Sequence, residues 1–151
     1  MTLSAWRITK QKYARTAFRG DGARIYGGRW NRPGTTMIYT AQSQSLAVLE
    51  MLVHLDSPDL LMKYIFFQVS IHPSFVEDLI VSRLPRNWKE DPIPARVQAT
   101  GDDWVAGAAS AVVRVPSALV PGESNFLLNP QHPDFRKLRI GPFQYDPRLG
   151  R

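Results

Sequence analysis

Residues 36–55, with the sequence TMIYTAQSQSLAVLEMLVHL, contain the change from strand to helix pattern that decides the fold class. Thr36 to Thr40 predicts a short strand, because β-branched and aromatic residues dominate it. Ser43 then occupies the position of an N-cap, and we expect a helix from Gln44 to Leu55. Asp56-Ser57-Pro58 is expected to end this helix.

Outside this stretch, strand and helix patterns follow one another without a regular βαβ rhythm. We expect strands at residues 3–9, 61–71, 111–115 and 138–145, a helix at 96–109, a long loop at 10–35 and short turns or helices at 74–95. At 151 residues and 44% hydrophobic content, the chain has material for one core. The predicted fold class is therefore α/β (mixed α+β), in a single domain rather than a doubly wound one.

Composition excludes several classes of protein. The chain has no cysteine, which excludes disulfides and thiolate metal sites, and its three histidines complete no ligand spacing, so we expect no metal. The N-terminal residues lack the pattern of a secretory signal, and no apolar stretch approaches the length of a membrane span. We therefore expect a cytoplasmic protein without membrane contact.

The formal net charge of +6 is concentrated near the N-terminus. Residues 10–32 contain Lys10, Lys12, Arg15, Arg19, Arg24, Arg29 and Arg32 against Asp21 alone. Such a cluster favours phosphate groups of a nucleotide or nucleic acid, or an acidic protein, and a solvated basic face is the alternative. Neither a complete GxGxxG motif nor a P-loop is present, which argues against a Rossmann or P-loop enzyme.

Glu50 is the charged residue in the apolar part of the predicted helix. It shares a helical stripe with Leu46, Leu49 and Val53, so we expect it to be substantially buried. Because an unpaired buried charge is costly, a cationic or hydrogen-bonding partner from another element is required nearby. A salt bridge to a core arginine would be purely structural, whereas a carboxylate retained for catalysis is the functional interpretation.

Two further motifs place ligand-binding groups beside turns. In Tyr26-Gly27-Gly28-Arg29-Trp30-Asn31, the glycines allow close backbone approach, Arg29 suits a pyrophosphate, and the two aromatic rings could stack on a flat ring. Tyr39 could face the same cavity, although core packing explains a strand tyrosine equally well. Ser124-Asn125 could cap a turn or bind a ligand.

The joint order of these motifs resembles the RES domain family, which is named for its arginine, glutamate and serine. The resemblance rests on Trp6-Arg7, Gly27-Gly28-Arg29-Trp30-Asn31, Ile38-Tyr39-Thr40, Leu46 to Glu50, Glu123-Ser124-Asn125 and Asn129-Pro130. It covers nearly the whole chain and implies one RES domain over residues 1–151. Residues 74–109 match no motif of the family and imply nothing about activity.

The resemblance implies a bacterial toxin of a RES–Xre toxin–antitoxin pair, with a fold related to ADP-ribosyltransferases. Its substrate would be NAD⁺, with no prosthetic group. Arg29, Tyr39 and Glu50 would form the catalytic set, and Arg7, Ser124 and Asn125 would line the cofactor pocket with Arg29 and Tyr39. The partner would be an Xre-type helix-turn-helix antitoxin that blocks the cleft in a hetero-oligomer, and no direct contact with nucleic acid is expected.

NAD⁺ chemistry suits a site with one carboxylate. Glycosidic cleavage usually uses two carboxyl groups, but nicotinamide leaves as a neutral molecule and needs no general acid. Glu50 could hold the ribose hydroxyls and stabilise the positive charge that develops on the sugar. The acceptor stays open: water gives a glycohydrolase, phosphate a phosphorylase, and a protein side chain an ADP-ribosyltransferase.

Two other functions remain open from the sequence. A nucleic-acid-binding protein could use the basic segment 10–32, with Trp30, Tyr26 and Phe18 as stacking platforms. Against this, no established nucleic-acid-binding motif is present. An inactive family member that acts only by binding a partner is the other alternative, but the motif residues are all present.

Overall fold

The computed structural model describes residues 1–53 and 63–143. The strands are β1 (Leu3–Lys10), β2 (Ile38–Ala41), β3 (Tyr64–Ile71), β4 (Val76–Asp78), β5 (Val112–Pro116), β6 (Ser124–Leu128) and β7 (Arg139–Phe143). The α-helices are α1 (Asp21–Tyr26), α2 (Gln44–Leu52) and α3 (Ala95–Gly107). Four 3-10 helices complete the described elements: η1 (Gln11–Thr16), η3 (Pro73–Phe75), η4 (Val81–Arg83) and η5 (Pro133–Lys137).

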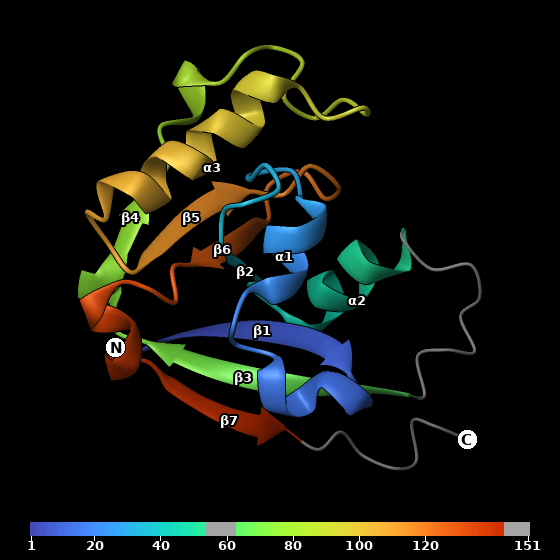
Figure 1. Ribbon diagram of the computed structural model, residues 1–151, viewed down its shortest axis with the longest axis vertical. Coiled ribbons are helices and arrows are strands. Elements are labelled where there is room, and N and C mark those ends of the chain that lie inside the picture. The colour runs from blue at the N-terminus through green and yellow to red at the C-terminus, as the bar shows by residue number, and fades with distance from the viewer. Residues whose placement is uncertain (54–62, 144–151) are drawn as a thin grey trace.

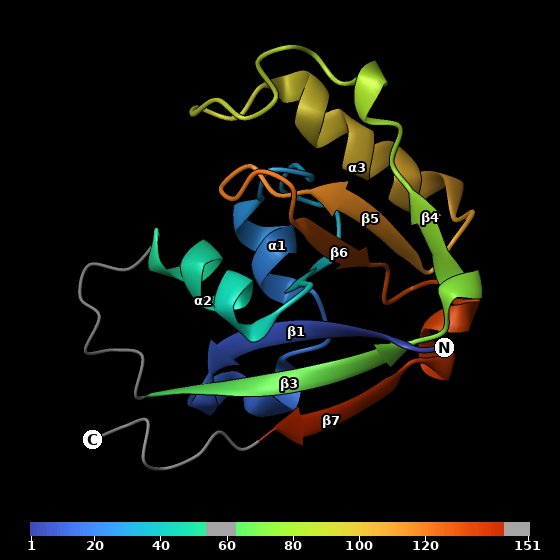
Figure 2. The same cartoon turned by 180° about the vertical axis from the view of Figure 1, so that it is seen from behind.

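The seven strands form one curled sheet in the order β4-β5-β6-β2-β1-β3-β7. All neighbouring strands are antiparallel except β4 and β5. The pairing between β1 and β2 is the shortest in the sheet, with Trp6 and Ala41 as the one pair of residues in register. In both views the two halves diverge at this point, and α1 and α2 lie between them (Figures 1 and 2). The predicted fold class, a single mixed α+β domain, is confirmed.

The core follows the alternation of the strands. In β3, Phe67, Val69 and Ile71 are buried at every second position, which is the period of a strand with one face on the core. The opposite half of the sheet is covered by α3, whose Val97 is fully buried together with Leu127 of β6. A smaller cluster lies under α2. No helix in the described part of the chain is long and apolar enough to cross a membrane.

The strand and helix predicted at residues 36–55 are present. Ser43 caps α2 by accepting a hydrogen bond from the Leu46 amide at 3.1 Å, as its position predicted. Helix α2 ends at Leu52 with Val53 as its C-cap, before the predicted end at Leu55, and the predicted stop at Asp56-Ser57-Pro58 lies outside the described residues. The predicted strands at 3–9, 61–71, 111–115 and 138–145 correspond to β1, β3, β5 and β7, although residues 61–62 and 144–145 are not described.

The prediction of a long loop at residues 10–35 is wrong in part, because η1 and α1 lie within it. Gly20 and Gly27 bracket α1 with positive φ angles of 77° and 74°. A six-residue helix between two glycines is too short to show helical periodicity, so the glycines alone marked its ends. Residues 74–95 do contain only short elements, but one of them is the edge strand β4.

Candidate active site

A cavity of about 660 Å³ opens beside the junction of β1 and β2. Its walls come from β1, β2, β6, α2, α1 with the turn after it, and residues within 89–93 and 118–119. Five residues that the sequence predicted for the site line this cavity: Arg7, Arg29, Tyr39, Glu50 and Asn125. The elements that carry them lie far apart in the chain and meet where the halves of the sheet diverge (Figure 1).

Glu50 is held through one of its two carboxylate oxygens. Its Oε1 accepts hydrogen bonds from the Ser117 hydroxyl at 2.8 Å and from Asn125 Nδ2 at 3.1 Å. The predicted partner from another element is thus present, and no ion pair of Glu50 with an arginine exists among the described residues. Oε2 has no partner within the same part of the chain, which leaves this oxygen for a ligand in the cavity.

The expectation that Glu50 is substantially buried holds in part, but the packed apolar stripe expected around it is absent. The Glu50 side chain is half-buried, and Leu49 and Val53 of the same helical stripe are 44% and 58% exposed. Only the first turn of α2, with Leu46, enters the core. The later turns form a wall of the cavity, so the apolar stripe faces an opening rather than packed side chains.

Ser117, which the sequence did not point to, orients Glu50. Its buried hydroxyl oxygen accepts hydrogen bonds from the backbone amides of Leu119 at 3.1 Å and Val120 at 3.0 Å. Because these donors occupy both lone pairs, the hydroxyl proton is directed to Glu50. The available clue was a serine between strand β5 and the Pro121-Gly122 turn, which is an ordinary position for a turn-capping serine.

Arg7 brings a positive charge to the cavity without a carboxylate partner in the described residues. Its Nε donates to the Ala17 carbonyl at 2.6 Å and its Nη1 to the Tyr39 carbonyl at 3.0 Å. Burial lowers the pKa of the Arg7 guanidinium to about 10, so the group remains charged at neutral pH. A charge removed from water in this way favours an anionic ligand beside it.

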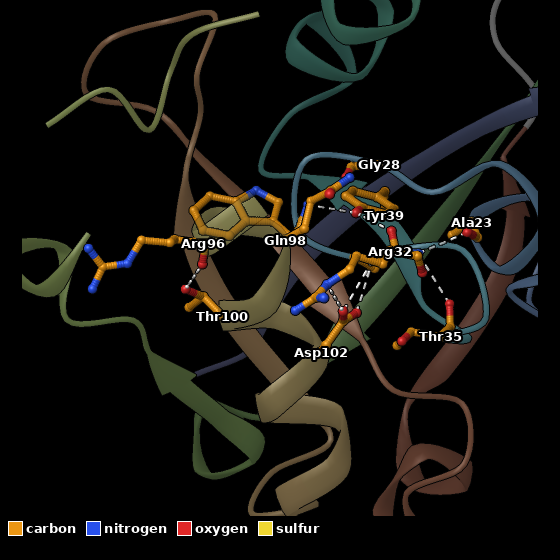
Figure 3. A network of polar contacts seen from close by, with 11 residues as sticks. Ala23, Gly28, Arg32, Thr35, Tyr39, Arg96, Gln98, Thr100 and Asp102 are labelled. Carbon is orange, nitrogen blue, oxygen red and sulfur yellow. Dashed lines mark hydrogen bonds and ion pairs between the residues drawn. The ribbon is translucent and has the colours of Figure 1, made fainter. Parts of the chain in front are cut away.

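Tyr39 connects the floor of the cavity to the turn that follows α1. Its hydroxyl donates to Asn31 Oδ1 at 2.6 Å and accepts from the Trp30 amide at 3.0 Å (Figure 3). Asn31 is fully buried, and its Nδ2 donates to the carbonyls of Ala23 and Thr35. Burial raises the pKa of Tyr39, so the phenol stays protonated. The hydroxyl is therefore a structural link, while Tyr39 also lines the cavity.

Helix α3 supports the same turn from the outside. Gln98 Nε2 donates to the Gly28 carbonyl at 3.0 Å, and Asp102 accepts from the Arg32 amide at 3.1 Å (Figure 3). Asp102 also forms an ion pair with Arg32 Nε at 3.3 Å. A side chain at Gly28 would lie 2.6 Å from the Tyr39 hydroxyl, so the turn requires glycine there. Residues 74–109, for which the family resemblance implied no activity, thus hold the turn after α1, one wall of the cavity, in place.

Replacing Tyr39 by phenylalanine is expected to lower the free energy of unfolding by about 2 kcal/mol, because the Trp30 amide and Asn31 Oδ1 lose their shared partner. Urea denaturation of the purified variant measures this change. Tyr13→Phe is the matched control, since Tyr13 is 51% exposed on η1. Equal denaturation midpoints for the two variants would contradict a structural link through the Tyr39 hydroxyl.

Arg29 lines the cavity but is also engaged with the protein. Its Nη1 donates to the backbone carbonyls of Trp88 at 2.8 Å and Glu90 at 3.1 Å. The sequence assigned this guanidinium to a pyrophosphate and did not foresee contacts with residues 59 and 61 positions away. Part of the guanidinium is thus committed to holding one wall of the cavity.

The three rings that could have served as stacking platforms for a nucleic acid are not all exposed. Trp30 is only 2% exposed and packs against Trp88, with ring centroids 6.0 Å apart. Phe18 packs edge-on against Phe67. Only Tyr26 of the three rings is highly exposed, at 83%. The proposal of a nucleic-acid-binding surface with three stacking platforms is therefore wrong for two of its rings.

Ser124, predicted to line the cofactor pocket, does not lie in the main cavity. It begins β6, and because side chains alternate along a strand, Ser124 and Asn125 point to opposite faces of the sheet. Ser124 lines a smaller hollow with Arg114 and Gln42, and its amide donates to Gln42 Oε1 at 2.7 Å. Ser117, rather than Ser124, is the serine that contacts Glu50.

Comparison with known proteins identifies the family. The family model of the RES domain matches residues 4–147. "Toxin Res" of Yersinia enterocolitica is 41% identical over 148 residues, covering 95% of this chain and 97% of the relative. The "Prs ADP-ribosylating toxin" of a Sphingobium strain is 35% identical, covering 99% of this chain and 98% of the relative.

Among solved structures, the toxin–antitoxin complex MbcT–MbcA of M. tuberculosis contains a chain similar to this one. The TM-score is 0.74 at 22% identity, covering 99% of this chain and 87% of that chain. At this identity the likeness shows a common fold. The family match, the close relatives named as toxins and the shared fold agree, and the chain belongs to the RES domain family of toxins.

Proposed function

We propose that the chain, as one RES domain over residues 1–151, is the toxin of a toxin–antitoxin module and cleaves NAD⁺ at the bond between nicotinamide and ribose. The observation that carries this proposal is the state of Glu50. Its Oε1 is occupied by Ser117 and Asn125, while Oε2 is left for a ligand in a cavity that also contains the charge of Arg7.

The geometry supports a division of labour among these groups. Glu50 Oε2 accepts hydrogen bonds from the ribose hydroxyls and stabilises the oxocarbenium-like charge as the bond to nicotinamide breaks. Nicotinamide departs with the bonding electron pair as a neutral molecule, so no general acid is required. Arg7 pairs with the pyrophosphate, and the ring of Tyr39 packs against the nicotinamide or its ribose.

The direct test is to incubate the purified protein with NAD⁺ and to measure free nicotinamide. Release above the uncatalysed rate supports the proposal, and its absence with a correctly folded protein refutes it. Mass spectrometry of the second product then identifies the acceptor. Water gives ADP-ribose, and inorganic phosphate gives ADP-ribose 1″-phosphate.

Transfer of ADP-ribose to a protein is the second candidate, and the relative named "Prs ADP-ribosylating toxin" favours it. Both candidates share the first bond cleavage and differ in what attacks the sugar afterwards. Incubation with labelled NAD⁺ and cell extract separates them, because transfer leaves the label on a protein band, whereas hydrolysis or phosphorolysis leaves it on a small molecule.

Replacing Ser117 by alanine is expected to lower kcat for nicotinamide release about tenfold, because Glu50 loses a donor that fixes its orientation. Ser124→Ala is the matched control, and its kcat is expected to stay near that of the wild type. Steady-state kinetics of both variants measure the difference. The opposite ranking of the two serines would contradict the assignment of Ser117 as the residue that positions Glu50.

We also propose that the partner is an Xre-type helix-turn-helix antitoxin and that the pair acts in the bacterial cytoplasm. The similar chain in the MbcT–MbcA toxin–antitoxin complex supports an antitoxin partner. Co-expression with the product of a neighbouring helix-turn-helix reading frame, followed by size-exclusion chromatography, tests this. Separate elution of the two proteins would refute the pairing.

A further inference from the structure

Residues 85–94, hereafter the strap, form one wall of the candidate active site. Lys89, Asp91 and Ile93 of this segment line the cavity. The strap contains Pro85, Pro92 and Pro94, which restrict its backbone. Two turns organise it further, since the Trp88 amide donates to the Pro85 carbonyl and the Glu90 amide to the Asn87 carbonyl.

Arg29 and Trp30 attach the strap to the turn after α1. The guanidinium of Arg29 binds the carbonyls of Trp88 and Glu90, which flank Lys89 on both sides. The ring of Trp88 packs against the buried ring of Trp30. Lys89 therefore lies between two anchored residues, and its position relative to the cavity is fixed by Arg29.

Lys89 offers a cation that no described carboxylate neutralises. Its Nζ lies 5.4 Å from the centroid of the Trp88 ring, and no carboxylate of the described residues forms an ion pair with it. Among the described residues, the charged side chains that line the cavity are Arg7, Arg29, Lys89, Glu50 and Asp91. Three positive and two negative charges leave one net positive charge. A ligand with a diphosphate group suits this balance.

We propose that Lys89 binds the phosphate groups of the substrate and that Arg29 acts as a positioning residue by holding the strap. This rests on the proposed function, because it places the diphosphate of the dinucleotide at the strap while Glu50 faces the reacting ribose. Arg29 thereby acts on the phosphate through Lys89 as well as through its own charge. Lys89 lies in the part of the chain for which the sequence predicted no role.

Calorimetric titration of the full chain with ADP tests the assignment of Lys89 without requiring turnover. Lys89→Met is expected to weaken ADP binding about tenfold and to leave adenosine binding unchanged, because only ADP carries phosphates. Lys89→Arg is expected to retain most of the affinity. Lys12→Met is the matched control, since Lys12 also lies over a neighbouring ring, that of Tyr13, but outside the cavity.

A double-mutant cycle tests the role of Arg29. If Arg29 positions Lys89, the loss caused by Lys89→Met shrinks in an Arg29→Met background, so the two effects do not add. Fully additive effects overturn the positioning role, and equal ADP affinity of Lys89→Met and Lys12→Met overturns the phosphate site. These outcomes are distinct from failure of the proposed function, which would appear as absent nicotinamide release by a wild-type protein that still binds ADP.

Discussion

Replacing Glu50 by glutamine is expected to lower nicotinamide release by about 10³-fold while leaving the fold intact. The glutamine carbonyl can accept the hydrogen bonds that Ser117 and Asn125 now donate to Oε1, so the side chain keeps its place. Its amide group then stands where Oε2 offers a negative charge to the sugar. The loss of charge opposite a developing cation removes transition-state stabilisation of the kind that costs two to three orders of magnitude.

Two measurements separate this effect from misfolding. The thermal unfolding midpoint of Glu50→Gln is expected to stay close to that of the wild type, since the variant conserves shape and hydrogen bonds. Glu77→Gln provides the matched control, because Glu77 is an exposed carboxylate on the edge strand β4, outside the cavity. A Glu50→Gln protein with undiminished turnover would refute the proposed role of the carboxylate.

The sequence indicated which groups form the site because their chemistry is local to each motif. Arg7, Tyr39, Glu50 and Asn125 lie on regular strands and a helix, whose periodicity sets their direction. The sequence could not predict which polar atoms of the site already form hydrogen bonds with other residues of the protein. Arg29 contacts residues about 60 positions away, and no local pattern encodes such a contact.

The error at Ser124 has a similar cause. The sequence places Ser124 and Asn125 together, but their strand turns adjacent side chains to opposite faces. The sequence does not show that residues 124–128 form a strand in the middle of the sheet. Ser124 and Asn125 therefore appeared equally able to reach a ligand. Ser117 contacts Glu50 instead, because the turn that follows β5 brings its hydroxyl to the carboxylate. This contact joins residues far apart in the chain, and no local pattern indicates it.

The element types were more predictable than their lengths and neighbours. Strand β3 is rich in β-branched and aromatic residues, and the N-cap Ser43 marks the start of α2. Helix α1 was missed because six residues cannot display a helical period. Gly101 lies inside α3 although glycine lowers helix propensity. The structure gives the reason for this glycine, because α3 crosses directly against the backbone of the turn at Trp30.

Replacing Gly101 by alanine is expected to destabilise the protein by about 3 kcal/mol or more, despite the higher helix propensity of alanine. An added Cβ would overlap the Trp30 carbonyl oxygen and lie 2.7 Å from its carbonyl carbon. Both contacts are with backbone, so no side-chain rotation relieves them, and α3 must move away from the turn. That movement would separate Gln98 from Gly28, and nicotinamide release should fall together with stability.

Gly107 in the same helix is the matched control for this prediction. A Cβ at Gly107 meets no atom within 4 Å, so Gly107→Ala is expected to leave activity unchanged and to stabilise the protein by up to about 1 kcal/mol. Urea denaturation of the two variants should therefore shift in opposite directions from the wild type. If Gly101→Ala unfolds at the wild-type urea concentration, α3 does not press on the turn and does not hold Gly28 and Arg32 in place.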